Sequence, residues 1–332
     1  MKDLSDSLLT AQRASSATPY VHCYLPYYGG GWDLSDYVKK VVETQQTYGS
    51  MLQVLLTDAA TWFIAGGIPR DVKGQMVDLG WGFTIEGTPE WELVQPYYVQ
   101  NARLISAPGM LLVQFNCYDM WQRLQMMQVM GDSAGYAPEW NKDTTVFDII
   151  EELLNGICDV RLDESDGIID SYMPLFKTSI TDSIAGAIAR LLSYTNCGAR
   201  FRRDGLHIYK LPENTDDAYQ YNSVHVFRSH VWDDEPSLPN RILVVDKIPS
   251  EDGGMHTYEG TATDTESYEA LGYYATRIYE VAWVTSDDEA QQIAEAILNS
   301  IQRERDQGIL IVPIMNVGQE IGDVVTIDDP RY

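Results

Sequence analysis

The chain has 332 residues, 45% of them hydrophobic, which is typical of a folded protein with two or three domains rather than a disordered one. Its 49 acidic residues outnumber its 23 basic residues and give a net charge of -26, which argues against direct binding of nucleic acid through clustered lysine and arginine. No apolar run approaches the roughly 20 residues that cross a bilayer. Residues 1–6 lack the basic and apolar regions of a signal peptide, so we expect synthesis in the cytoplasm.

The first part of the chain is predicted to consist of strands separated by turns of glycine and proline. Alternating apolar and polar residues predict strands at 20–25, 36–44, 51–57, 76–85, 97–106 and 111–118. Pro108 and Gly109 predict a hairpin turn between the last two strands, and the glycines at 29–31 predict a loop. Strands at this spacing favour an antiparallel barrel or sandwich.

The middle of the chain changes to helices and a hairpin. Apolar residues recur at helical spacing over 119–129 and predict a first helix. Residues 145–148 resemble a capping box at the start of a second helix, and a third helix is expected to begin at 181 or 182. The Asp-Gly pair at 204–205 lies between two alternating runs and predicts a hairpin. We therefore expect a small α+β unit here.

The last part of the chain combines strands with one long amphipathic helix. Ser286 and Glu289 form the clearest capping box in the sequence, and the apolar stripe behind them predicts a helix over 286–306. A turn is expected at 251–254. Strands are predicted at 241–246, 309–315 and 324–327.

No residue pattern points to reaction chemistry. The chain has no phosphate-binding loop, no nucleotide-binding glycine motif and no Gly-x-Ser-x-Gly elbow. His225 and His230 would fall on opposite faces of a strand, so they are not expected to share a metal ion. The four cysteines are too far apart for a zinc site and are expected to be buried free thiols: Cys23, Cys117, Cys158 and Cys197. We predict no catalytic, cofactor-binding or metal-binding residues, and a protein that is not an enzyme.

Two alternatives concern polysaccharide. With 49 acidic residues, the chain could supply the pair of carboxylates that a glycosidase needs. In a carbohydrate-binding protein without catalysis, exposed Trp32, Trp62 or Trp91 would stack on sugar rings. Packing in a hydrophobic core is the simpler explanation for these tryptophans, since buried aromatic rings contribute most to core stability.

A short phrase of the form Gly-x-x-Val-x-(Leu/Ile) occurs twice, at 74–79 and at 322–327. In each copy a glycine allows the backbone to turn into a strand whose apolar residues alternate with polar ones. The repeat suggests two related β-domains on one chain.

Four phrases, at 48–58, 73–82, 286–290 and 322–325, together resemble the baseplate hub or tail-tip hub proteins of tailed phages, a group that includes the late control protein D type. The resemblance implies an α+β, mainly β fold with two tube-like antiparallel β-barrel domains and an α+β insert between them. The expected domains are 1–118 for the first barrel, 119–224 for the insert, and 225–332 for the second barrel with its helix.

The resemblance also implies a function and partners. Such hubs are rings, usually trimers, that join the sixfold tail tube to a threefold spike or tip and line the DNA conduit. The resemblance implies that the two copies of the repeated phrase are two copies of one interface, so the expected assembly interface includes Val77, Leu79, Val325 and Ile327. The expected partners are other copies of the chain, a tail tube or distal tail protein, a spike, tip or fibre protein, and a tape-measure protein. A trimer would carry 3 × -26 = -78 charges, and an acidic lumen would repel DNA rather than bind it. The expected location is the virion tail.

Overall fold

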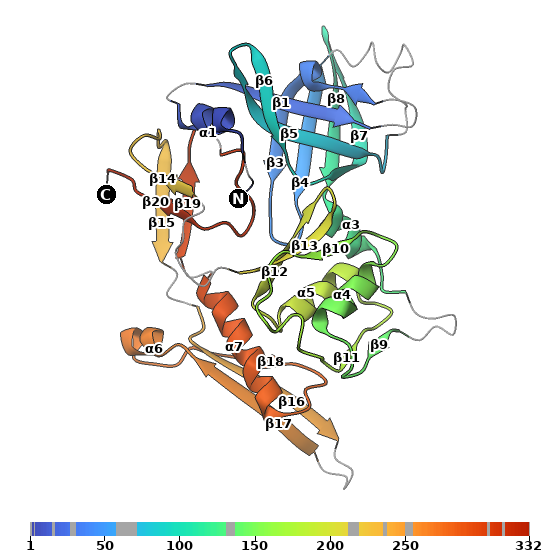
Figure 1. Ribbon diagram of the computed structural model, residues 1–332, viewed down its shortest axis with the longest axis vertical. Helices are drawn as coiled ribbons and strands as arrows, with labels where there is room; N and C mark the ends of the chain where they lie inside the picture. The colour runs from blue at the N-terminus through green and yellow to red at the C-terminus, as the bar shows by residue number, and fades with distance from the viewer. Residues whose placement is uncertain are drawn as a thin grey trace.

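The computed structural model describes residues 2, 4–14, 17–26, 31–57, 72–130, 137–211, 219–234, 238–249, 255–303, 306–313 and 316–331. The predicted glycine loop at 29–31 falls mostly outside these residues, and Trp62 and the predicted turn at 251–254 fall outside them completely. The fold is mixed α and β, mainly β. The molecule is elongated, with a large sheet at one end, a small helical unit in the middle and a long helix on a small sheet at the other end (Figure 1).

The first part of the chain forms one large antiparallel sheet. Its strands are β1 (Thr18–Leu25), β2 (Trp32–Asp33), β3 (Val38–Thr44), β4 (Met51–Thr57), β5 (Met76–Ile85), β6 (Thr88–Leu93), β7 (Tyr97–Ala107) and β8 (Met110–Tyr118). They pair in the order β2-β1-β5-β7-β8-β4-β3, and β6 pairs with β5. The hairpin predicted at Pro108 and Gly109 is confirmed, because Ala107 pairs with Met110 and Gly109 has a φ of 75°.

This sheet curls around a single hydrophobic core. The two ends of the strand order, β2 and β3, are consecutive in the chain and are joined by a 3-10 helix, η1 (Ser35–Tyr37). β1, β4, β5, β7 and β8 each contribute buried residues to one cluster, so these strands surround the same interior. The described strands nevertheless show no ladder between β3 and β1 or β2. The predicted closed barrel is therefore, in the described residues, a curled sheet whose ends are joined by the chain.

Glu43 of β3 reaches across the interior of the curled sheet to two strands in the middle of the strand order. Its carboxylate accepts hydrogen bonds from Trp81 Nε1 of β5 at 2.6 Å and from the Tyr97 hydroxyl of β7 at 2.7 Å. The side chain of Gln45 donates a third bond at 2.8 Å. These bonds hold β3 against strands that it does not pair with.

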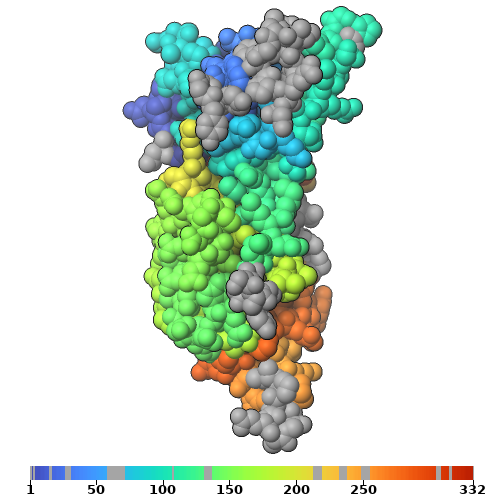
Figure 2. Space-filling model, turned by 90° about the vertical axis from the view of Figure 1, so that its right-hand side faces the viewer, coloured from blue at the N-terminus to red at the C-terminus, as the bar shows by residue number. Residues whose placement is uncertain are grey.

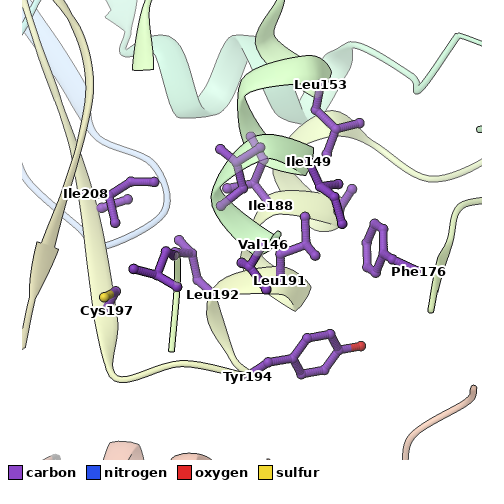
Figure 3. Close-up of a cluster of buried hydrophobic side chains, with 14 of the residues drawn as sticks. Val146, Ile149, Leu153, Phe176, Ile188, Leu191, Leu192, Tyr194, Cys197 and Ile208 are labelled. Carbon is purple, nitrogen blue, oxygen red and sulfur yellow. The ribbon is translucent and has the colours of Figure 1, made fainter. Parts of the chain in front are cut away.

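The middle part is the small α+β unit that the sequence predicts. It contains α3 (Met120–Met126), β9 (Glu139–Trp140), α4 (Val146–Leu154), β10 (Val160–Leu162), β11 (Phe176–Lys177), α5 (Ile184–Leu192), β12 (Cys197–Arg202) and β13 (Gly205–Lys210). The predicted capping box is confirmed, because the Thr145 hydroxyl accepts from the backbone N–H of Asp148 at 3.1 Å. The apolar faces of α4 and α5 pack together beside β13 (Figure 3).

The last part of the chain forms three small sheets. Its elements are β14 (Tyr219–Tyr221), β15 (Ser229–Asp234), β16 (Arg241–Pro249), β17 (Met255–Thr263), α6 (Thr265–Leu271), β18 (Thr276–Glu280), α7 (Asp287–Arg303), β19 (Asp306–Ile311) and β20 (Val325–Ile327). β14 pairs with β20, β15 with β19, and β16 with both β17 and β18. The predicted second barrel is thus not a single barrel among the described residues, because these pairs share no ladder with one another.

The long helix α7 covers the free edge of the β16–β18 sheet. The backbone N–H groups of Glu259 and Thr261 on β17 donate to the side chains of Asp287 and Gln291 on α7, at 3.0 and 2.9 Å. The predicted helix start is confirmed, since the Ser286 hydroxyl accepts from the backbone N–H of Glu289 at 3.1 Å. A sheet edge left open would invite association with another strand, and α7 covers this one.

One hydrophobic cluster joins the middle part of the chain to the last part. One continuous cluster of buried residues runs from Trp121 on α3 to Leu298 on α7 and includes Val244 on β16. The boundary near residue 224 therefore stays a prediction. Among the described residues, no helix is long and apolar enough to cross a membrane.

Candidate functional site

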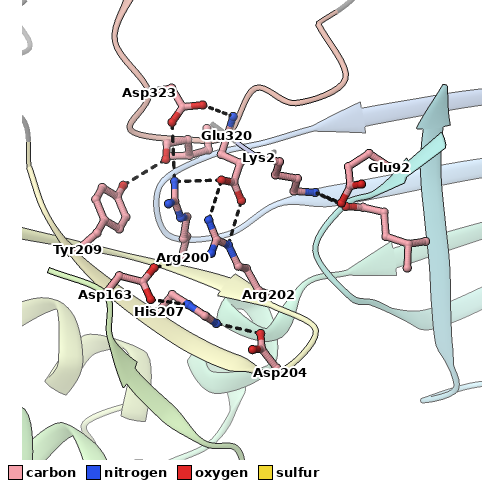
Figure 4. Close-up of polar contacts among 12 residues, drawn as sticks. Lys2, Glu92, Asp163, Arg200, Arg202, Asp204, His207, Tyr209, Glu320 and Asp323 are labelled. Carbon is pink, nitrogen blue, oxygen red and sulfur yellow. Dashed lines mark hydrogen bonds and ion pairs between the residues drawn. The ribbon is translucent and has the colours of Figure 1, made fainter. Parts of the chain in front are cut away.

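Segments from four regions of the chain meet at a cluster of paired charges, which we call the ionic junction (Figure 4). Lys2 comes from the N-terminal segment and Glu92 from β6 of the large sheet. The hairpin β12–β13 and the neighbouring loops of the middle part contribute most of the rest, and the segment before β20 contributes the last two. The junction consists of Lys2, Glu92, Asp163, Arg200, Arg202, Asp204, His207, Glu320 and Asp323.

Glu320 is the centre of the ionic junction. Its carboxylate accepts two hydrogen bonds from Arg202, from Nε at 3.2 Å and from Nη2 at 2.9 Å, and lies 3.3 Å from Nη1 of Arg200. Arg200 also lies 3.8 Å from Asp323 and stacks over the ring of Tyr209 at 4.5 Å. A carboxylate held by a planar guanidinium in this two-bond geometry fixes both direction and distance.

Burial and pairing act in opposite directions on the charges of the junction. Burial on its own would raise the pKa of Glu320, but the hydrogen bonds from Arg202 and the charge of Arg200 outweigh it and hold this pKa below its ordinary value. Burial lowers the pKa of Lys2, which donates to the carbonyl of Leu93 and lies 4.0 Å from Glu92. Removing one partner would leave a buried charge uncompensated.

His207 lies between two carboxylates at the base of the junction. Its Nδ1 is 2.8 Å from Asp163 and its Nε2 is 2.8 Å from Asp204, while the residue is only 5% exposed. The ring therefore links two loops of the middle part through both of its nitrogens. The hydrogen bond from His207 is the main reason that the pKa of Asp204 is lowered.

A second contact fastens the middle part to the start of α7. The buried Glu289 accepts hydrogen bonds from the hydroxyl groups of Tyr172 and Thr285 and forms an ion pair with Lys142 at 3.2 Å. Burial would raise the pKa of Glu289, but the bonds from Tyr172 and Thr285 hold it below its ordinary value. The middle part is thus held at both of its ends.

We predict that Glu320→Gln lowers the free energy of unfolding by about 2–3 kcal/mol at pH 7, because Arg200 and Arg202 lose a buried ionised partner. The lowered pKa of Glu320 means that its contribution is present above the ordinary value of 4.5 and is lost as the pH falls below that value. The loss caused by Glu320→Gln should therefore shrink at low pH. Denaturant unfolding at a series of pH values measures this.

The matched control for this prediction is Glu139→Gln. Glu139 pairs with Lys177 at 2.5 Å, but its side chain is 46% exposed. We therefore expect Glu139→Gln to lower the free energy of unfolding by less than about 1 kcal/mol at every pH. Equal losses for the two variants, or a Glu320→Gln loss that does not change with pH, would contradict the assigned role of the junction.

A cavity of about 420 Å³ opens beside the junction, between the large sheet, the β12–β13 hairpin and residues 319–321. The charged groups on its wall are mainly members of the junction and are paired with one another. Arg203 is paired in the same way, because it contacts Asp78 of β5 at 3.1 Å. Groups held in this way fix the orientation of the parts of the chain. Among the described residues, no group of three or more histidine, cysteine, aspartate or glutamate side chains is arranged to hold a metal ion.

The predicted assembly residues lie in two different environments. Val77 and Leu79 on β5 are completely buried in the core of the large sheet. Val325 and Ile327 on β20 are half-buried and pair with Tyr219 and Tyr221 of β14. The structure brings no member of one pair to a member of the other. Their role in assembly stays a prediction, and the side chains of Val77 and Leu79 are buried inside the large sheet.

The two copies of the repeated phrase share a backbone conformation but not a pairing pattern. Gly74 and Gly322 both have a positive φ, of 79° and 90°, and each precedes a strand. β5 is antiparallel to its neighbours, whereas β20 runs parallel to β14. The glycine therefore serves the local turn in both places.

Trp91, a candidate for stacking on sugars, already stacks within the protein. Its ring lies 4.6 Å from that of His22 at an angle of 14°, and Tyr20 packs on it at 5.5 Å. A side chain at Gly80 would clash with the Trp91 ring at 2.5 Å, so Trp91 fills the space above a glycine of β5. Trp32 is half-buried and packs against the core of the large sheet.

The four cysteines are unpaired, as expected from their spacing. Cys23, Cys117 and Cys197 are buried, and Cys158 is half-buried. Burial raises the pKa of Cys23 and of Cys197 to about 12. Thiols with such a pKa are poor nucleophiles at neutral pH.

Comparisons with known proteins identify structures that share the fold of this chain but do not identify a family. No family model matches the chain, and no curated protein matches its sequence. A tail protein from Neisseria meningitidis MC58 aligns with a TM-score of 0.67 and 10% identity over 95% of this chain and 87% of its own. The 43 kDa tail protein of prophage MuSo2 from Shewanella oneidensis aligns with a TM-score of 0.65 and 13% identity over 94% of this chain and 89% of its own.

A third structure matches less closely. Prophage tail protein gp18 from Listeria monocytogenes EGD-e aligns with a TM-score of 0.51 and 12% identity over 82% of this chain and 76% of its own. At these identities the similarity shows that the chain shares its fold with the three tail proteins.

Proposed function

We propose that this chain is a structural protein of a phage-type tail and acts as a hub at the tail tip or baseplate. The observation that carries the proposal is the match of nearly the whole chain, and not of one domain, to the tail proteins from Neisseria and Shewanella. A fold alone does not imply a function, so the ionic junction is the second support. A part that bears load between a tube and a tip needs its domains held in fixed orientation, and paired buried charges with two-bond geometry supply that.

In this proposal the chain forms a ring of three copies that joins the sixfold tail tube to a threefold tip. Each copy would place its large sheet beside its smaller β-region (β14, β15, β19 and β20), so that the ring presents six β-regions. Its neighbours would be a tail tube or distal tail protein on one side and a spike, tip or fibre protein on the other. The net charge of -26 per copy would keep DNA from adhering to the conduit.

Native mass spectrometry of the purified protein, with negative-stain imaging of the same sample, tests this proposal. We expect a closed ring of three copies with a central hole. A chain that stays monomeric at high concentration, or that forms only open-ended oligomers, would contradict the ring. Release of reducing sugar from envelope polysaccharide would instead support an enzyme.

A further inference from the structure

A groove of about 860 Å³, which we call the α5–α7 groove, runs between the middle part of the chain and the long helix α7. One wall comes from α5 and the loop that leads into β12, and the other is the side of α7 that bears Ile293, Ile297 and Ile301. β18 and residues 281–283 line the groove between these walls. Figure 2 shows the middle part in green against the orange part of the chain that contains α7.

The α5–α7 groove exists because α7 covers only two of the three strands in the sheet beneath it. Ile242 and Val244 of β16 face α7 and are completely buried. The register places Arg277 of β18 opposite Ile242 and Tyr279 opposite Val244, so all four side chains lie on the same face of the sheet. Arg277 is nevertheless exposed and Tyr279 is only half-buried. β18 therefore lacks the helical cover that β16 and β17 have.

The charge of the α5–α7 groove is opposite to the charge of the whole chain, which has 49 acidic residues against 23 basic ones. Among the described residues that line the groove, Glu280 is the single acidic residue, and the basic ones are Lys177, Arg190, Arg277 and Arg303. Lys177 and Arg190 have acidic partners outside the groove, whereas Arg277 forms no ion pair with any residue that the structure describes. A lining of this kind favours an occupant with acidic side chains.

Trp283 lines the α5–α7 groove with a strained backbone. Its φ is 72°, in the left-handed region that bulky residues rarely adopt. Trp283 is 43% exposed, and Lys177 lies 4.4 Å from the centre of its ring. Strained residues cluster at ligand-binding sites, and tryptophan is enriched among the residues that contribute most to protein interfaces. These observations support a binding surface rather than an accidental gap.

The length of the α5–α7 groove matches a short helix. Between Ile293 and Ile301, α7 rises by about 12 Å at 1.5 Å per residue, so a helix of about three turns would lie along this wall. Such a helix would cover β18 as α7 covers the other two strands. It would contact α5 and α7 through apolar residues at i, i+3 or i+4 and i+7, the spacing that places them on one face.

No described helix of this chain offers a free apolar face of that length. α3, α4, α5 and α7 bury their apolar residues in the core that joins the middle and last parts. α1 (Asp6–Arg13) packs its Leu8 against Phe83 and Val317. α6 has no buried residue, but its seven residues form only about two turns. The occupant is therefore expected to come from a different protein.

We propose that the α5–α7 groove binds an amphipathic helix of about three turns from another protein, with apolar residues on one face and acidic residues beside them. The apolar face packs on α5 and α7, and an acidic side chain pairs with the guanidinium group of Arg277. This contact goes beyond the proposed ring and does not depend on it, because it needs only one copy of the chain.

Selection from a peptide library tests the proposed contact. The library displays helices of about 14 residues, or four turns, with leucine fixed at i, i+3, i+7 and i+10 and all other positions randomised. It is selected against the purified wild-type chain. We expect the enriched peptides to contain more aspartate and glutamate than the starting library. Fluorescence polarisation then gives the Kd of the most enriched peptide for the wild-type chain and for the variants.

The variants change the charge and the exposed ring of the groove. Arg277→Glu should weaken binding of the selected peptide at least ~10-fold, because a like charge then faces its acidic residues. Trp283→Ala should weaken binding to a similar degree by removing the exposed ring. The matched control is Lys40→Glu, which makes the same change of charge at an exposed position of β3 in the large sheet and should leave the Kd unchanged.

Three outcomes would overturn the proposed contact. The first is enriched peptides that are no more acidic than the library, and the second is equal binding of the selected peptide by Arg277→Glu and Lys40→Glu. The third is loss of self-association in Arg277→Glu but not in Lys40→Glu, which would assign the groove to a second copy of the chain. A wild-type chain that binds acidic peptides as a monomer would support the contact and contradict the ring.

Discussion

Val77→Asp is expected to unfold the large sheet, with a loss of at least about 4 kcal/mol in the free energy of unfolding. Val77 has no exposed surface and lies in the core with Leu79, Tyr97 and Val99. An isolated carboxylate there has no partner, and its burial costs several kcal/mol, to which the lost packing of two methyl groups is added. Folded domains are stable by only about 5–15 kcal/mol.

The pH dependence of the stability of Val77→Asp distinguishes the effect of the buried charge from the effect of the changed side-chain shape. Burial would raise the pKa of the introduced carboxyl group, so the loss should shrink as the pH falls and the group becomes neutral. Val77→Thr, which has nearly the same shape without a charge, should lose only about 1–2 kcal/mol at all pH values. Urea unfolding followed by tryptophan fluorescence measures both, and a Val77→Asp protein as stable as the Val77→Thr protein would contradict the assignment of Val77 to the core.

Val325→Asp should behave differently. Val325 is half-buried on β20, and water can reach an introduced carboxylate there, so we expect a loss of about 1 kcal/mol or less in the folded chain. A role of Val325 in assembly would then appear as failure to form rings by a folded protein. Because Val77 is completely buried, its substitution by aspartate cannot test assembly separately from folding.

Strands with one buried face could be predicted from the sequence. The ranges 51–57 and 76–85 coincide with β4 and β5, because alternate residues of these strands lie in one core and so alternate in polarity. The caps at Thr145 and Ser286 were predicted for a similar reason, since they act over three residues of sequence. Local chemistry of this kind is visible in a sequence.

Two elements of the first part were missed because their local signals are weak. The helix α1 begins at the Ser5 cap and buries only Leu8 and Gln12, too few residues for a clear period. The strand β6 contains Pro89 and Glu90, which are uncommon in strands. β6 is held in place by Trp91, which covers Gly80 of the neighbouring strand, and that contact has no local signature.

The ionic junction could not be predicted at all from spacing. Arg202 and Glu320 are 118 residues apart, and no local pattern relates them. The one available signal was the run of arginines at 200, 202 and 203 in a chain poor in basic residues. The prediction of closed barrels was wrong for a related reason. Alternation of apolar and polar residues shows that a strand has an inner face, but it does not show whether the two edge strands of the sheet pair with each other.

Gly260→Val is expected to detach α7 from the sheet beneath it and to lower the free energy of unfolding by about 3 kcal/mol or more. A Cβ atom at Gly260 would lie 2.2 Å from the backbone of Ala290 and Gln291, and a helix backbone cannot turn aside as a side chain can. The helix would have to withdraw from β17, breaking the bonds that Asp287 and Gln291 accept from the strand. Hydrogen exchange should then be faster along α7, with the large sheet unaffected.

The matched control is Gly272→Ala. Gly272 has a φ of 76°, and a Cβ atom added there would meet no other atom within 4 Å, so its substitution costs only backbone strain, about 1–2 kcal/mol. Gly260 has no such backbone constraint, so its cost comes from contact with the helix alone. Since α7 also carries Glu289, which holds the middle part through Tyr172 and Lys142, withdrawal of the helix should loosen that contact as well. Faster exchange confined to α7, with the residues around Tyr172 unchanged, would show that the order of the middle part does not depend on its contact with α7.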